Sequence, residues 1–183
     1  MAEAPIAPPQ QATLLWTARC HYDVVNLLNY SFRSGGTLPV AGFATLSEHE
    51  TAVRPADYIE ETGLRSSLAV LTLIDAAFKV DYRYRCENKL KDDLSRAFRA
   101  THKRRRSYQN VNLEQDIFDA WLKYASGARA LICELRSAFR FRHWLAHGRY
   151  WTPKLGRNYD FNSLYSLADA VFCSLPLCGM GEA

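Results

Sequence analysis

Apolar residues recur every three or four positions along most of the chain, a spacing that predicts α-helices. In the first such stretch, residues 11–34, the apolar stripe comprises Leu14, Ala18, Tyr22, Val25, Leu28 and Phe32. The same spacing predicts helices over about 56–87, 92–104, 112–124 and 127–147, and a last helix from Asp160 or Asn162 to just before Pro176. No convincing run of strand-type alternation is found. We therefore expect an all-α bundle of about five to six helices, with two long antiparallel helices at its centre.

Residues that begin or end helices lie close to these predicted boundaries. Asp92 and Asn112 are suited to helix N-termini, and Gly148 is placed to end the fifth helix in a left-handed cap. Gly63 is a position at which the second helix could break. Residues 35–55 carry Gly, Pro and Thr and are expected to form a long loop, with room for a short helical piece.

The composition is that of an ordinary globular domain. The chain has 183 residues, of which 48% are hydrophobic and 23% charged. We expect a disordered, proline-rich lead-in over 1–10, one helical domain over 11–176 and a flexible tail over 177–183. The longest apolar run, 68–74, is too short to span a membrane, and residues 1–10 lack the features of a signal peptide. Five cysteines without CxxC spacing are typical of free thiols in a cytoplasmic protein.

Positive charge is concentrated in the second half of the chain. Residues 1–90 hold 8 Lys and Arg against 10 Asp and Glu, whereas residues 91–183 hold 15 against 9. Such an imbalance is compatible with ordinary solubility, but it also favours a polyanionic partner, of which nucleic acid is the commonest.

Two charged residues interrupt predicted apolar stripes. Arg142 falls in the stripe of the fifth helix, and Asp75 falls in the stripe of the second, seven residues after Leu68 and three before Phe78. An unpaired charge in such a position is costly, so we expect Asp75 to lie beside Arg142 or another cation of the fifth helix. A purely structural ion pair, or side chains that extend to water, would satisfy the same pattern.

A second face of the fifth helix is basic. By helical spacing, its members are Arg129, Arg136, Arg140, His143 and His147. A charged face is often only a solvated one, but histidine exchanges protons near neutral pH, and His147 lies at the helix C-terminus, where the dipole favours positive charge. The i, i+4 spacing of the histidines also occurs in zinc helices; here no glutamate separates them and no third ligand is evident, so we predict no metal.

Residues 142–147, Arg-His-Trp-Leu-Ala-His, match the R-x4-6-H signature of the HEPN superfamily, the higher eukaryotes and prokaryotes nucleotide-binding domains. In that family a polar residue commonly follows the arginine, and His143 holds this position. The stretches 75–83 (DAAFKVDYR), 92–98 (DDLSRAF) and 139–161 also resemble RNase-like prokaryotic HEPN proteins. The resemblance covers most of the chain after residue 60.

This resemblance implies a metal-independent endoribonuclease without a cofactor, a hydrolase used as a toxin or defence effector. Arg142 and His147 would be catalytic, supported by His143 and Asp75. It also implies a homodimer that joins two motifs, and a possible cognate antitoxin protein. We expect RNA phosphates to contact cations of the basic half, including the 103–106 run and Arg129, and Tyr150 and Trp151 either to stack on bases or to be core residues. The expected RNA-binding residues around the motif are Arg136, Arg140, Arg149, Tyr150, Lys154 and Arg157.

Two other classes of function fit the same residues. One is a non-catalytic HEPN module that binds RNA, a nucleotide or a protein such as a nucleotidyltransferase. The other is a structural helical dimer in which Arg142 and His147 only make interface bonds.

Overall fold

The structure is a computed structural model that describes residues 10–33, 55–149, 155 and 157–179. Within these residues the chain is helical and contains no strand, which confirms the all-α prediction. The α-helices are α1 (Gln10–Arg33), α3 (Pro55–Glu87), α4 (Asp93–Arg105), α5 (Asp119–Tyr124), α6 (Arg129–Ala146) and α7 (Phe161–Ser174). A π-helical turn, η1 (Leu113–Phe118), leads into α5, and a 3-10 turn, η2 (Ser126–Ala128), leads into α6.

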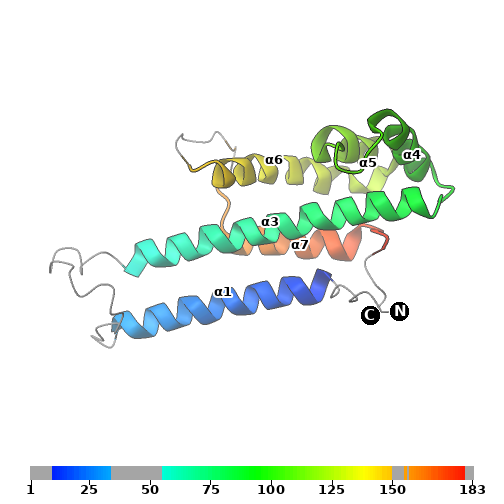
Figure 1. The fold of residues 1–183 in the computed structure, drawn as a ribbon. Coiled ribbons are helices and arrows are strands. Elements are labelled where there is room, and N and C mark those ends of the chain that lie inside the picture. Colours follow the sequence, from blue (N-terminus) through cyan, green and yellow to red (C-terminus); the bar gives the residue numbers. More distant parts are fainter. Residues whose placement is uncertain (1–9, 34–54, 150–154, 156, 180–183) are drawn as a thin grey trace, which may run out of the picture.

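Helix α3 is the axis of the bundle (Figure 1). Helices α1 and α7 pack against one side of it, and α4, α5 and α6 cover the other. Both α1 and α6 run antiparallel to α3, whereas α7 runs parallel to it. The predicted antiparallel pair of long helices is α1 and α3, with α3 central and α1 on the outside.

Capping side chains fix the helix starts close to the predicted positions. The Asp92 side chain accepts a hydrogen bond from the backbone N–H of Ser95, which starts α4. At α7 the cap is Asp160, not Asn162, because Asp160 forms a reciprocal capping box with Ser163. Gly63 does not break α3, which continues through it to Glu87. The expected loop over 35–55 lies, except for Pro55, outside the described residues.

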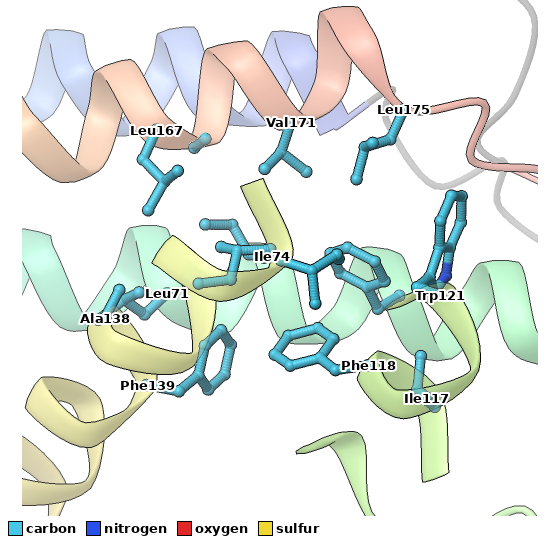
Figure 2. Packing of buried hydrophobic residues seen from close by; sticks show 14 of the residues in the cluster. Leu71, Ile74, Ile117, Phe118, Trp121, Ala138, Phe139, Leu167, Val171 and Leu175 are labelled. Atoms are coloured by element: carbon cyan, nitrogen blue, oxygen red, sulfur yellow. The ribbon is translucent and has the colours of Figure 1, made fainter. Parts of the chain in front are cut away.

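The core lies between α3, α5, α6 and α7 (Figure 2). Leu71, Ile74 and Phe78 of α3 meet Phe118 and Trp121 from the η1–α5 segment, and the Phe78 and Phe118 rings pack edge to face with centroids 5.0 Å apart. From the remaining helices come Leu135, Ala138, Phe139, Leu164, Leu167 and Val171, all buried. Helical spacing predicts an apolar face of the fifth helix made of Leu131, Leu135, Ala138, Phe139 and Leu145. The prediction is confirmed at the centre of this face, while Leu131 and Leu145 are only half-buried.

Helix α1 packs less completely than its stripe predicts. Leu14 and Ala18 of this stripe are buried, but Tyr22 is 46% exposed. Its hydroxyl instead donates a hydrogen bond to Asn162 Oδ1 at 2.6 Å. Next to it, His21 stacks on Phe161, and the ring centroids are 3.8 Å apart. Tyr22 belongs to the apolar stripe but is exposed because a tyrosine at the rim of the bundle can pack its ring while its hydroxyl reaches a polar partner.

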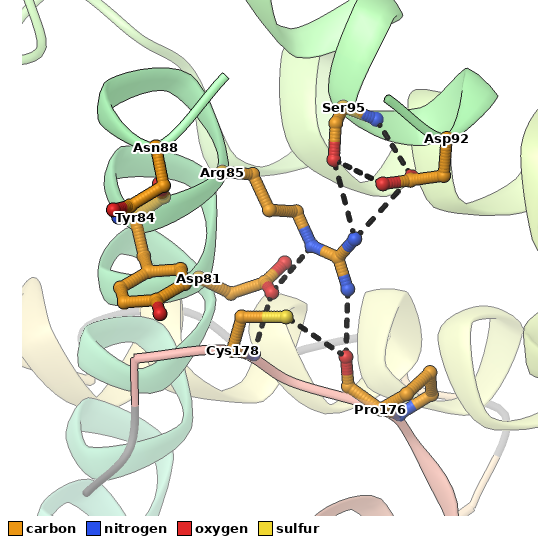
Figure 3. A network of polar contacts seen from close by, with 8 residues as sticks. All are labelled: Asp81, Tyr84, Arg85, Asn88, Asp92, Ser95, Pro176 and Cys178. Atoms are coloured by element: carbon orange, nitrogen blue, oxygen red, sulfur yellow. Dashed lines mark hydrogen bonds and ion pairs between the residues drawn. The ribbon is translucent and has the colours of Figure 1, made fainter. Parts of the chain in front are cut away.

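A buried polar network attaches the segment after α7 to α3 (Figure 3). Arg85 donates to Asp81 at 2.6 Å and to the carbonyl oxygen of Pro176 at 2.7 Å, and both charged side chains are almost fully buried. The backbone N–H of Cys178 donates to Asp81 at 2.8 Å. The chain therefore stays attached to α3 as far as Cys178.

Two further features bear on the predictions from composition. None of the helices in the described ranges is both long and apolar enough to cross a membrane. Within the described residues none of the five cysteines is joined in a disulfide bond, as their number and spacing predict.

Candidate functional site

The C-terminal end of α6 is closed by the predicted left-handed cap. His147 is the capping residue, and Gly148 follows with a φ of +82°. The N–H of Arg149 then donates to the carbonyl oxygen of Trp144 at 3.3 Å, the bond that defines a Schellman motif. This cap ends α6 and places His147 at the end of the helix.

Arg142 lies beside Asp75, as the two interrupted stripes predict. The distance from Arg142 Nη2 to Asp75 Oδ2 is 3.7 Å, and the residues come from α6 and α3. Asp75 is 9% exposed, and Lys79 Nζ approaches its two carboxylate oxygens at 3.0 and 3.1 Å. A buried carboxylate thus holds one cation from its own helix and a second from the facing helix.

Arg142 keeps donors that this contact does not use. Its side chain is 36% exposed, and 3.7 Å is too long for a hydrogen bond. Among the described residues no hydrogen-bond acceptor partners its buried Nε atom. A guanidinium that is restrained on one side and open on the other has the geometry to receive an anionic group.

The two histidines of the motif form a pair on the surface. The rings of His143 and His147 have centroids 4.1 Å apart and both residues are exposed. On an ideal helix His147 projects about 140° away from Arg142, and His143 lies between the two directions. The histidines therefore face solvent on the flank of α6, whereas Arg142 faces α3.

Several cations of the predicted RNA surface already have carboxylate partners. Arg149 pairs with Glu61 at 2.6 Å, Arg157 pairs with Glu134 at 2.6 Å, and Arg136 pairs with Asp119. In the described part of the chain Arg129 and Arg140 have no ion pair and are exposed. Of the other predicted contacts, Tyr150, Trp151 and Lys154 lie outside the described residues.

The basic run at the end of α4 is also partly neutralised. Arg104 and Arg105 both bind the buried carboxylate of Asp116 at 2.9 Å. Asp116 in turn accepts from the backbone N–H of Asn112 at 2.9 Å, so these two arginines fasten α4 to the η1 turn. Their guanidinium groups are structural in this arrangement.

Two residues next to the site were not predicted. Lys79 is four residues after Asp75, and this helical spacing could have identified it. Glu61 pairs with Arg149 across 88 positions of sequence, and no local pattern marks such a contact.

Within the described ranges no group of three or more His, Cys, Asp or Glu side chains gathers as a metal site would require. Comparison with family models, curated proteins and solved structures gave no match.

Proposed function

We propose that this protein is a metal-independent endoribonuclease of the HEPN type. The observation that carries the proposal is that the last two turns of α6 hold both Arg142, restrained by buried Asp75 and partly open to solvent, and the exposed His143–His147 pair. Acid–base catalysis of RNA cleavage needs a fixed cation for the phosphate and groups that exchange protons near neutral pH.

The reaction follows from these roles. His147 accepts the proton of the ribose 2′-hydroxyl, and the 2′-oxygen attacks the adjacent phosphorus. Arg142 stabilises the negative charge on the pentacoordinate phosphate. A second histidine donates a proton to the departing 5′-oxygen, which breaks the P–O5′ bond. The products are a 2′,3′-cyclic phosphate and a 5′-hydroxyl.

A homodimer supplies the second histidine in this proposal. Within one chain Arg142 and His147 project to different sides of α6, so a second copy placed across the helix end would complete the set. The cellular role that follows is that of a toxin or defence effector in the cytoplasm, restrained by a cognate antitoxin protein.

A non-catalytic RNA-binding or protein-binding module is the second candidate. The carboxylate partners of Arg136, Arg149 and Arg157 favour it, because neutralised cations weaken a phosphate-tracking surface. Such a module would bind without cleaving.

Incubation of the purified protein with total RNA in EDTA separates these functions. We expect cleavage that yields phosphatase-resistant 3′ ends and that falls at least about 100-fold in His147→Ala and Arg142→Ala. Arg19→Ala, which removes an exposed cation of α1 outside the predicted RNA surface, is the control and should retain most of the activity. Binding with no cleavage by the wild-type protein would support the module instead.

A further inference from the structure

A second cationic site lies at the other end of α3. A cavity of about 620 Å³ opens between the last turn of α3 and α4, and four cations line it: Lys89, Arg96, Arg99 and Lys103. The volume falls in the range of small-molecule pockets. The site is distinct from the Arg142 region, because Cys86 at its wall lies about 16 Å along α3 from Asp75. Figure 1 shows α4 at the end of α3 remote from the C-terminus of α6.

Helix α4 turns one face toward this cavity. Arg96, Arg99 and Lys103 are spaced three and four residues apart, so they line one side of the helix. Arg99 is fixed by a hydrogen bond from Nη1 to the carbonyl oxygen of Leu90 at 2.5 Å. Arg96 approaches the exposed Asp93 at 3.2 Å. Among the described residues Lys89 and Lys103 have no carboxylate partner, so the cavity carries excess positive charge.

The position of Lys89 is set by an unusual helix ending. Its φ is +50°, and the N–H of Leu90 donates to the carbonyl oxygen of Arg85 at 3.3 Å, as in a Schellman motif. Glycine is the usual residue in this left-handed position, and any other side chain costs stability. Here that position places a lysine at the cavity.

The walls of the cavity are apolar. They include Ala100, the aliphatic stems of the cations and the buried Cys86. Burial raises the pKa of the Cys86 thiol to about 11, so the cysteine stays protonated and offers no thiolate nucleophile. A cavity with apolar walls, cationic heads and no reactive group is suited to binding rather than to covalent chemistry.

We propose that this cavity binds a 5′-phosphorylated nucleotide, either free or at the end of an RNA chain. Clustered phosphates would meet Lys89, Arg99 and Lys103, and the nucleoside would lie against the apolar wall. Several cations within one cavity favour the adjacent phosphates of a free nucleotide or of a 5′-triphosphate end over the middle of a strand, where each nucleotide carries a single charge. This binding goes beyond the proposed ribonuclease activity and does not depend on Arg142 or His147.

Two binding measurements test the proposal. Calorimetry gives the affinity for ATP. Fluorescence anisotropy gives the affinities for two labelled RNA oligonucleotides of the same sequence, one with a 5′-triphosphate end and one with a 5′-hydroxyl end. The protein is the full chain carrying Arg142→Ala and His147→Ala, so that RNA survives and the first site is removed. In this background Lys89→Gly with Lys103→Gln removes two cavity cations, and the glycine suits the left-handed turn. The matched control, Arg19→Gln with Lys123→Gln, removes two exposed cations elsewhere.

We expect the cavity variant to lose at least about tenfold in affinity for ATP or for the 5′-triphosphate RNA, and the salt dependence of that binding to weaken. The control should lose little. Binding of ATP alone would identify a free nucleotide, and binding of the 5′-triphosphate RNA alone would identify an RNA end. The proposal would be overturned if neither ATP nor the 5′-triphosphate RNA bound at low salt. It would also be overturned if ATP did not bind and the 5′-triphosphate and 5′-hydroxyl RNAs bound with equal affinity. A third contrary result would be an equal loss of affinity in the cavity variant and the control variant. RNA cleavage by the wild-type protein is measured separately, so the nucleotide-binding proposal and the ribonuclease proposal can each be refuted independently of the other.

Discussion

Asp75 of α3 and Arg142 of α6 face each other across the helix interface, with Oδ2 and Nη2 3.7 Å apart. The carboxylate is buried and the guanidinium is about one-third exposed, so the contact both joins the helices and orients a cation toward solvent. Asp75 is thus a positioning residue in the proposed site, and it acts through Arg142.

Replacement of Asp75 should therefore affect both stability and activity. Asp75→Ala leaves Arg142 and Lys79 without their shared carboxylate, and we expect a loss of about 1–2 kcal/mol because both cations are partly solvated. RNA cleavage should fall as Arg142 loses its orientation. Urea denaturation and cleavage rates measure the two effects. Glu87→Gln, which breaks the exposed pair with Arg83, should cost no more than about 0.5 kcal/mol. Equal small losses in both variants would contradict the role of Asp75.

The sequence predicts this pair because each residue interrupts an apolar stripe. The same periodicity, with the capping residues Asp92, Asn112 and Asp160, predicts most helix boundaries to within a residue or two. These features are local, so a single sequence carries them.

Other features depend on partners that local patterns do not reveal. The π-helical turn of η1 forms where Asp116 binds Arg104, Arg105 and the N–H of Asn112, and only the folded chain brings the arginines to it. The pairing of Arg149 with Glu61 likewise depends on the packing of α6 along α3. On the basic face of α6, Arg129, Arg140, His143 and His147 are exposed as expected, but the pairing of Arg136 with Asp119 could not be foreseen.

Gly148 should be more sensitive to substitution than its open surroundings suggest. Its φ is +82°, and a Cβ there would meet no atom within 4 Å, so the cost of Gly148→Ala is confined to the backbone. We expect a loss of about 1 kcal/mol, with lower activity as the end of α6 shifts. Gly63→Ala is the matched control: it also has open space but lies within α3, where alanine should stabilise by about 0.5–1 kcal/mol. Thermal denaturation measures whether each substitution lowers or raises the stability. A Gly148→Ala variant as stable as the wild-type protein would refute the left-handed cap.

Asp116 should make stability depend on pH in the acid range. Burial alone would raise the pKa of this carboxyl, but hydrogen bonds from Arg105 and Asn112 outweigh burial and lower it. A lowered pKa contributes stability above about pH 4, and that stability is lost as pH falls through the pKa of the folded state. Asp116→Asn should thus cost about 1–2 kcal/mol at pH 7, since the arginines are partly exposed, and progressively less below pH 4.

Urea denaturation at several pH values measures this dependence. Asp23→Asn, which removes an exposed carboxylate 3.9 Å from Arg19, is the control and should cost no more than about 0.5 kcal/mol throughout. A cost of Asp116→Asn that stays constant down to pH 2.5 would contradict a lowered pKa.

Arg140 and Arg136 should differ in their contribution to RNA binding. Both are on α6, but Arg136 pairs with Asp119, whereas Arg140 is exposed and without an ion pair in the described structure. Arg140→Ala should weaken binding of single-stranded RNA several-fold and lower the salt slope by about 1. Arg136→Ala should cause smaller changes in RNA affinity and in the salt slope. The measurement is RNA anisotropy across salt concentrations in the His147→Ala background, and the reverse order would show that ion pairs do not decide which cations meet phosphate.

Mixing two inactive variants tests whether the site is shared between copies. If Arg142 of one chain acts with His147 of another, an Arg142→Ala chain and a His147→Ala chain together rebuild one Arg142–His147 pair in each mixed dimer. Random exchange makes half of the dimers mixed, and one of the two sites in each carries the pair, so a quarter of wild-type cleavage is the upper limit. Because the same site lacks the other copy's His147 as proton donor, we expect cleavage below that limit but above the level of either variant alone. Each variant alone should stay inactive at the same total concentration, which makes the pure variants their own control.

The oligomeric state decides how the mixing result is interpreted. Cations of two α6 ends would repel each other in a free dimer, so apolar contacts away from the site must hold the copies together and bound phosphate should strengthen the assembly. Light scattering with and without RNA measures this. A protein that stays monomeric at working concentration and still cleaves RNA with full dependence on His147 would exclude the shared site. His143, whose ring centroid lies 4.1 Å from that of His147, would then be the second proton carrier within one chain.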